Sequence, residues 1–343
     1  MIALLLTVIG CKPIIEEITT KGDIYGLKDT PENKKAVTQT DNVLKVSDNY
    51  YLLIDEHVYI QKPAILTDSL TQTTNLRLEN YSELIQLFPN LNFYVFYLER
   101  MAFAPYNPLS SSFSEADSRR SFQYFLENKP EKLEVSYMLL ENLEQHKEFF
   151  FRTDHHWNIR GAWHAYEIIF DMLSKTNPGI SPKRELFEFV KLNDVAFCGS
   201  YALRTQYPCV PEQFEYARTN IPNYQTWVNG EKRIYGSAQK YFDGNFDSEN
   251  YTNHYAEFYG YTTALVEYQF ENTGNRNLLI IGGSYTRAMQ MYVASHYKTT
   301  YVIDLREYEN FSLGEFIQSH KVDDVLIIGD ISVYGREGWL INP

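Results

Sequence analysis

Cysteine, positive charge and long apolar runs are all scarce in this sequence of 343 residues. There are three cysteines, and 31 lysine and arginine residues stand against 44 aspartate and glutamate residues, giving a formal net charge of −13. This charge argues against nucleic acid as a partner, because phosphate binding needs a basic surface, and equally against a surface that binds anionic lipid. The hydrophobic fraction of 44% is typical of a globular protein, and the length allows one large domain or two smaller ones.

The apolar run at residues 1–11 is too short to span a bilayer as a helix. Gly10 followed by Cys11 resembles the end of a bacterial lipoprotein signal, in which the cysteine is lipidated and becomes the mature N-terminus. No lysine or arginine precedes the run; the alternative is an ordinary apolar N-terminal strand. We therefore expect an exported protein, anchored in the membrane by an N-terminal lipid or signal. Residues 1–11 are the signal remnant and residues 12–46 a polar tether.

The two remaining cysteines, Cys198 and Cys209, flank a short polar loop. In an oxidising compartment they can pair, and closing this loop would stabilise the fold by roughly 3 kcal/mol. The alternative is two free thiols in a cytosolic protein.

Residues 47–343 predict one α/β domain. Apolar periodicity predicts strands at 91–98, 148–152, 278–281, 300–305 and 325–328, and helices at 76–87, 112–127, 134–146, 158–173, 285–296 and 313–320. Such alternation implies a parallel sheet with helices on both faces. A hairpin at 50–61 opens the domain, and residues 177–211 predict irregular structure. The tyrosine-rich stretch that follows, with a hairpin signal at Asn229-Gly230, completes a β-rich insertion over about 197–270.

Polar residues with catalytic potential follow the aromatic strand predicted at 148–152. On a continued strand, Asp154 and His156 share a face with Cα atoms about 6.6 Å apart, and His155 faces the other way. A carboxylate at that distance can orient an imidazole and stabilise its charged form, which is the base half of a hydrolase triad. Trp157 is interpreted as a wall of the site or as plain core.

The missing nucleophile is predicted at Ser284, where a buried strand runs through Gly282-Gly283 into a helix. Ligands of open α/β sheets bind at this edge, and the free N–H groups of Ser284 and Tyr285 could hold an oxyanion. The alternative is ordinary loop and cap chemistry, since serine is a favoured helix cap. Asp154 and His156 also follow a predicted parallel strand, so both elements are expected to meet at one edge of the sheet.

Other residues near these motifs have weaker signals. Arg100 and Arg287, together with Tyr285 and Gly283, are candidates for the lining of the cleft, although long side chains near strand ends are usually solvated. A metal site built from Asp154, His155, His156 and His164 is disfavoured, because a strand turns His155 away and the sequence has no His-Glu-x-x-His pattern. We therefore expect neither a metal nor another cofactor.

The motif Asp154-His155-His156-Trp157 resembles the signature of the DHHW family of extracytoplasmic proteins. The chain is also similar, more distantly, to the alginate O-acetylation proteins, in which an Asp-x-His-Trp motif precedes a Gly-x-Ser motif matched here by Ser284. The resemblance covers roughly residues 45–343. It implies a three-layer SGNH-hydrolase-like, flavodoxin-like fold with the motifs in permuted order, and a Ser–His–Asp site.

The resemblance also implies an activity: transfer of an O-linked acyl group, such as acetyl, to a cell-surface or exported polysaccharide. A membrane-bound partner that hands over acyl groups is compatible with this role. The alternatives are a carbohydrate O-acetyl esterase of the same fold and a non-catalytic surface protein that binds carbohydrate. In the last case the tyrosines of residues 201–268 would stack on sugar rings, whereas packing within a sheet is the other explanation for them.

Overall fold

The computed structural model describes residues 42–343 except 237–252 and 272–273. The predicted signal remnant with Cys11, and the predicted tether as far as residue 41, lie outside the described residues, as does part of the predicted insertion. Strand β1 (Val43–Lys45) pairs with the next strand, so the end of the predicted tether is already folded. Within the described ranges, no helix combines the length and apolar character needed to cross a bilayer.

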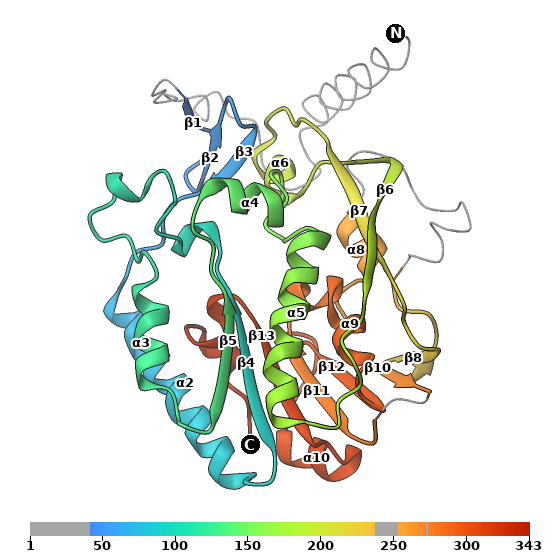
Figure 1. Cartoon of the computed structure of the whole chain (residues 1–343). Helices are drawn as coiled ribbons and strands as arrows, with labels where there is room; N and C mark the ends of the chain where they lie inside the picture. The colour runs from blue at the N-terminus through green and yellow to red at the C-terminus, as the bar shows by residue number, and fades with distance from the viewer. Residues whose placement is uncertain (1–41, 237–252, 272–273) are drawn as a thin grey trace.

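The centre of the molecule is a sheet with the order β5-β4-β13-β11-β12-β10-β8-β9 (Figure 1). Its first five strands run parallel to one another: β5 (Leu133–Met138), β4 (Asn92–Leu98), β13 (Asp324–Gly329), β11 (Asn277–Gly282) and β12 (Thr299–Ile303). The other three pair in antiparallel fashion: β10 (Leu265–Phe270), β8 (Tyr224–Val228) and β9 (Glu231–Lys232). The predicted α/β class with a largely parallel sheet is therefore confirmed.

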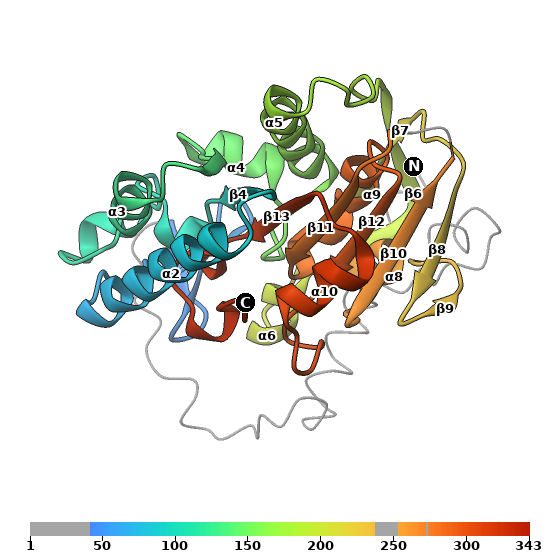
Figure 2. The ribbon, with the colours of Figure 1, turned by 90° about the horizontal axis from the view of Figure 1, so that it is seen from below.

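Alternating side chains of each central strand fill two separate cores, as strand geometry requires. On one face, Phe93, Val95 and Tyr97 of β4 pack under α2 (Asp68–Leu87), α3 (Arg120–Asn128) and α10 (Leu313–His320). On the other, Tyr94 and Phe96 pack under α5 (Ile159–Thr176) and α9 (Gln290–Ala294). Figure 2 shows the sheet between these two helix layers. Both layers are needed because a mainly parallel sheet is apolar on both faces.

Several predicted elements are confirmed, and others are wrong. The helix expected at 134–146 is strand β5 followed by α4 (Leu143–Phe149), and the strand expected at 148–152 is absent because α4 occupies its start. The helix expected at 112–127 begins later, as α3, after a 3-10 turn at Ser110–Ser112. The helix expected at 285–296 is a 3-10 turn, η4 (Ser284–Ala288), followed by α9.

The region predicted as irregular and then β-rich has more order than expected. Strand β6 (Leu186–Phe197) pairs with β7 (Glu212–Thr219) in a separate two-stranded sheet. Two short helices also occur in this region: α6 (Ser200–Thr205) between β6 and β7, and α8 (His254–Tyr259) before β10. The expected hairpin joins β8 to β9, where Asn229 and Gly230 take positive φ angles of 51° and 82°. Since β8, β9 and β10 belong to the central sheet, much of the predicted insertion extends that sheet.

A second small sheet lies at one end of the molecule. It consists of β1, β2 (Tyr50–Leu53) and β3 (Val58–Gln61), and the predicted hairpin at 50–61 is its β2–β3 pair. In Figure 1, β3, α4 and α6 gather above the end of the central sheet where β4 finishes. The candidate site lies at this end.

The N-terminus of α5 depends on one side chain. Asn158 Oδ1 accepts hydrogen bonds from the amides of Arg160 (2.9 Å) and Gly161 (3.1 Å), and Asn158 Nδ2 donates to the carbonyl of Glu148 (2.8 Å). We predict that Asn158→Ala lowers the free energy of unfolding by about 1–2 kcal/mol, because the first-turn amides lose their acceptor. Asn158→Ser, which restores a cap, should recover most of this loss in urea unfolding. Equal losses in the two variants would contradict the capping role.

Candidate active site

Ser284 stands at the carboxyl end of β11, at the first residue of the 3-10 turn η4. The strand can end so close to its neighbour because residue 282 is glycine: a Cβ there would lie 2.8 Å from the carbonyl oxygen of Ile328 and 2.3 Å from Thr286 Cγ2. The following turn lifts Ser284 out of the sheet, where it is half-buried. A serine in this position remains reachable from solvent.

Asp154 and His156 lie in the tight connection between α4 and α5. An isolated bridge joins Phe150 to Trp157, and the amide of Phe151 donates to the carbonyl of His156 (3.2 Å). The predicted strand is therefore wrong here, and so is the expectation that His155 faces away. The rings of His155 and His156 are neighbours, with centroids 3.7 Å apart.

The three predicted triad residues form one chain of hydrogen bonds. His156 Nε2 lies 2.7 Å from Ser284 Oγ, and His156 Nδ1 lies 2.7 Å from Asp154 Oδ1. The same carboxylate oxygen accepts the backbone amide of His156 (2.8 Å). Because an ionised carboxylate only accepts, Nδ1 carries the proton, and Nε2 is left to accept the serine hydroxyl. This is the arrangement needed to make the serine a nucleophile.

The charges at the site keep Asp154 ionised. Burial by itself raises the pKa of the Asp154 carboxyl, but electrostatic attraction to His156, the hydrogen bond from the His156 ring and attraction to His155 outweigh burial and hold this pKa below its ordinary value. Burial, followed by electrostatic repulsion between the two imidazoles when both would be protonated, lowers the pKa of His155 to about 3. His155 is therefore neutral at physiological pH, and its Nδ1 lies 2.8 Å from Ser200 Oγ.

Two buried tyrosines enclose the imidazole. The ring of Tyr255, on α8, stacks on His156 with centroids 3.9 Å apart and planes 6° from parallel, and its hydroxyl donates to the Ser284 carbonyl (3.1 Å). Tyr285 meets His156 edge-on at 5.3 Å and donates to the His155 carbonyl (2.8 Å). Tyr255 was not predicted from the sequence. Its segment contains many tyrosines, and no pattern in it indicates which of them faces the site.

The other candidates occupy distinct places around the triad. Trp157 is fully buried, with its ring 6.4 Å from that of Phe96 and 5.8 Å from that of Tyr285, so it joins the core to the site wall. Gly283 lies beside the side chain of Trp339. A Cβ on Gly283 would lie 3.3 Å from Trp339 Cη2.

The two arginine candidates are both held by protein groups. Arg100 is anchored by Asp330 (3.0 Å) and Gln61 (2.6 Å), and it borders a small pocket shared with Asp154 and His155. Arg287 bonds Thr262 Oγ1 and lines a small pocket on the Gly283 side of Ser284.

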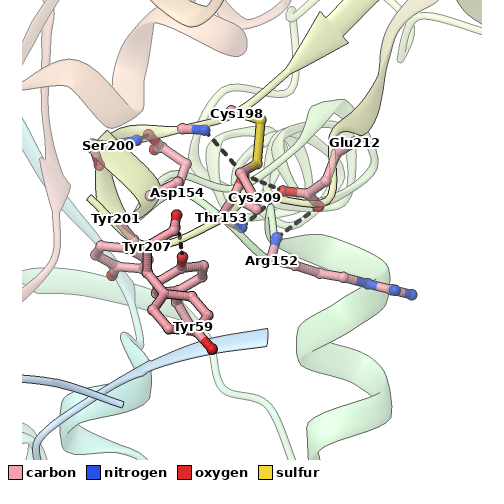
Figure 3. The surroundings of a disulfide bond; sticks show 12 residues. Tyr59, Arg152, Thr153, Asp154, Cys198, Ser200, Tyr201, Tyr207, Cys209 and Glu212 are labelled. Carbon is pink, nitrogen blue, oxygen red and sulfur yellow. Dashed lines mark hydrogen bonds between the residues drawn. A yellow bond between two sulfur atoms is a disulfide. The ribbon is translucent and has the colours of Figure 1, made fainter. Parts of the chain in front are cut away.

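A disulfide closes the loop beside Asp154. Cys198 and Cys209 are bonded, with Cα atoms 6.1 Å apart, and both are buried. Figure 3 shows Ser200 and Glu212 on either side of residues 152–154. The amide of Ser200 donates to Asp154 Oδ2 (2.6 Å). Glu212, in which burial raises the pKa to about 7, accepts from the backbone of this turn.

The geometry also bears on the metal alternative. The donor atoms of Asp154, His155 and His156 lie within 4.8 Å of one another. However, Asp154 Oδ1 and His156 Nδ1 are at hydrogen-bonding distance from each other, and His156 Nε2 is directed at the serine. His164 is stacked on Phe149 and is not a member of this group. The arrangement favours proton transfer over metal ligation.

A family model, the SGNH hydrolase-like domain of the acetyltransferase AlgX, matches residues 109–253. The matched segment contains Asp154 and His156 and ends before Ser284. No curated protein matches the chain significantly in sequence.

Solved structures share the fold over most of the chain. Bacillus cereus PatB1 superposes with a TM-score of 0.65 at 17% identity, covering 85% of this chain and 99% of PatB1. A second PatB1 structure, with a sulfonyl adduct, superposes with a TM-score of 0.63 at 17% identity. The match covers 83% of this chain and 98% of PatB1. A DHHW family protein from Eubacterium siraeum superposes with a TM-score of 0.60 at 16% identity. The match covers 88% of this chain and 95% of that protein. These matches confirm the predicted fold class, and the family model confirms the resemblance to an SGNH hydrolase-like domain over residues 109–253. The permuted motif order stays a prediction.

Acid should destabilise the fold through His146, which is buried beside the site and stacked on Phe150 at 4.8 Å. Burial lowers its pKa to about 3, below the value of about 6.5 for free histidine. Between these values the unfolded chain binds a proton that the folded chain does not, so stability is full above pH 6.5 and falls as the pH drops toward 3.

We predict that His146→Phe, which retains the ring stacking, reduces this pH dependence by about 1.4 kcal/mol per pH unit within the window. Urea unfolding between about pH 4.5 and 7.5 measures the slope. An unchanged slope in the variant would show that His146 is not the group that titrates.

Proposed function

We propose that this chain is an extracytoplasmic serine-dependent O-acyltransferase, with acetyl as the acyl group and a cell-surface or exported polysaccharide as the acceptor. The observation that carries the proposal is the hydrogen-bonded chain Asp154–His156–Ser284, with 2.7 Å at both steps. The match of residues 109–253 to an acetyltransferase domain supports the choice of acyl group.

In the first half of the reaction, Ser284 Oγ attacks the carbonyl carbon of the donor ester while His156 Nε2 takes the hydroxyl proton. Asp154 stabilises the positive imidazolium that forms. The amides of Ser284 and Tyr285, at the start of η4, are the proposed donors to the negative carbonyl oxygen. When the carbon–oxygen bond of the donor breaks, His156 returns the proton to the leaving oxygen, and the acyl group remains on Ser284.

In the second half, a sugar hydroxyl gives its proton to His156 Nε2 and attacks the acyl-serine, and the returning proton restores the Ser284 hydroxyl. An esterase would follow the same path with water as the acceptor, so the two activities differ only in what reaches the acyl-enzyme. The Cys198–Cys209 bond supports the extracytoplasmic part of the proposal, because disulfides persist in oxidising compartments.

The nucleophile is tested by Ser284→Ala. We expect kcat for release of a chromogenic acetyl ester to fall by roughly 10⁴-fold or more, because the covalent step is lost. A sulfonyl fluoride should add its sulfonyl group to the wild-type serine with loss of fluoride, and mass spectrometry should find no such adduct in the variant. Ser174→Ala, on the outer face of α5, is the matched control and should behave as the wild type.

The binding-protein and metal alternatives give different results in the same experiment. A carbohydrate-binding protein would release no chromophore and would retain its glycan in Ser284→Ala. A metalloenzyme would lose turnover in excess EDTA, whereas the proposed serine enzyme should be unaffected.

The acceptor is tested by adding oligosaccharides to the acetyl ester reaction. For a transferase we expect acetylated sugar by mass spectrometry and faster chromophore release, because the sugar hydroxyl competes with water for the acyl-serine. Release of acetate alone, at a rate independent of added sugar, would assign the esterase activity instead.

A further inference from the structure

Asp154 is held by two different parts of the chain. Its Oδ1 bonds the His156 ring and amide, and its Oδ2 accepts the amide of Ser200 at 2.6 Å. Ser200 is 46 residues further along the chain. The orientation of the acid therefore depends on the position of the loop that carries Ser200.

The same loop packs directly on the acid through Gly199. A Cβ on Gly199 would lie 2.2 Å from Asp154 Cβ and 2.7 Å from Asp154 Oδ2, distances at which one of the two must move. The amide of Gly199 also donates to Thr153 Oγ1 (3.0 Å), and the amide of Tyr201 donates to the Thr153 carbonyl (3.0 Å). Residues 199–201 thus fix residues 153 and 154 from one side.

Glu212 fixes the same turn from the other side. Its Oε1 accepts the amide (2.8 Å) and the hydroxyl (2.6 Å) of Thr153, and its Oε2 accepts the amide of Arg152 (2.7 Å). The Thr153 hydroxyl therefore accepts from Gly199 and donates to Glu212, linking the two sides (Figure 3).

The Cys198–Cys209 bond ties these two sides together. Cys198 directly precedes Gly199, and Cys209 lies three residues before Glu212, so the bond closes the loop between both groups that hold the turn. Tyr59 adds a further contact, because its hydroxyl donates to the Tyr207 carbonyl within this loop (3.2 Å).

We infer that the Cys198–Cys209 disulfide, Gly199 and Glu212 form a positioning device that holds Asp154 in register with His156, so that full turnover requires the oxidised loop. The inference rests on the proposed function, since it assigns to these residues an effect on the rate of the triad. None of them contacts the reacting atoms. A misplacement of about 1 Å in a catalytic group is enough to lower a rate by roughly 10²-fold.

The test compares the oxidised wild type, the dithiothreitol-treated wild type and Cys198→Ser/Cys209→Ser. Dithiothreitol supplies two electrons and two protons, yielding two cysteine thiols and its own cyclic disulfide. We expect reduction and double substitution each to lower kcat for the acetyl ester by roughly 10- to 100-fold with KM within about threefold, because the acid moves while the cleft remains. Dithiothreitol should not affect the double variant.

Proton NMR provides a readout that does not depend on turnover. The Nδ1 proton shared by His156 and Asp154 should give a downfield signal in the oxidised wild type, and this signal should shift or broaden on reduction at temperatures where circular dichroism shows a folded protein. A folded, reduced protein with unchanged kcat and an unchanged signal would overturn the inference. If the oxidised wild type itself shows no turnover, the proposed function fails, and the NMR signal alone decides the positioning role.

Gly199→Ala tests the device with the disulfide intact and carries the test if the double variant does not fold. Its methyl group must displace Asp154 or the loop, so we expect a loss of kcat at least as large as that on reduction. Gly179→Ala is the matched control, because a Cβ there meets only Asn177 Oδ1 at 3.8 Å. Equal activity of both alanine variants and the wild type would contradict the proposed role of the loop.

Discussion

The site depends on an imidazole that is hydrogen-bonded through both of its nitrogens to groups far apart in the chain. His156 and Ser284 are separated by 128 residues, and a 2.7 Å hydrogen bond joins them. To bring them together, β11 must end at a glycine and α5 must start directly after the aromatic motif. The buried ring of Tyr255, stacked on the imidazole, then limits its rotation. Because Asp154 and His156 are buried, the electrostatic interactions between them are stronger than they would be in water.

Positions of functional residues could be predicted from the sequence where a residue type occurs in few kinds of local structure. A buried apolar strand that ends in two glycines and a serine predicts an exposed hydroxyl at a sheet edge, and Ser284 occupies such a place. Asn158 stands at the start of the helix predicted at 158–173, and asparagine is a favoured cap, which agrees with its place before α5. The expected meeting of Asp154, His156 and Ser284 followed from motif chemistry, although the strand assumed for it is a turn.

What the sequence did not predict depends on contacts between distant segments. The apolar residues at 149–151 fit a strand or a helix end equally well, and the helical start of α4 decided between them. Ser200 and Glu212 have ordinary local patterns, and their role appears only when the loop they flank lies against Asp154. Propensity is a weak guide in such segments, because tertiary packing overrides it.

In the part of the chain that the structure describes, the central sheet ends on one side in β9, which has two residues, Glu231 and Lys232, both exposed. The Lys232 ammonium lies over the ring of Trp227, 5.6 Å from its centroid, and so shields the aromatic surface of the preceding strand. A short, charged border offers few free amides to an incoming chain and disfavours pairing between sheets of different molecules. At high local concentration, copies of the chain would thus resist edge-to-edge aggregation at this border.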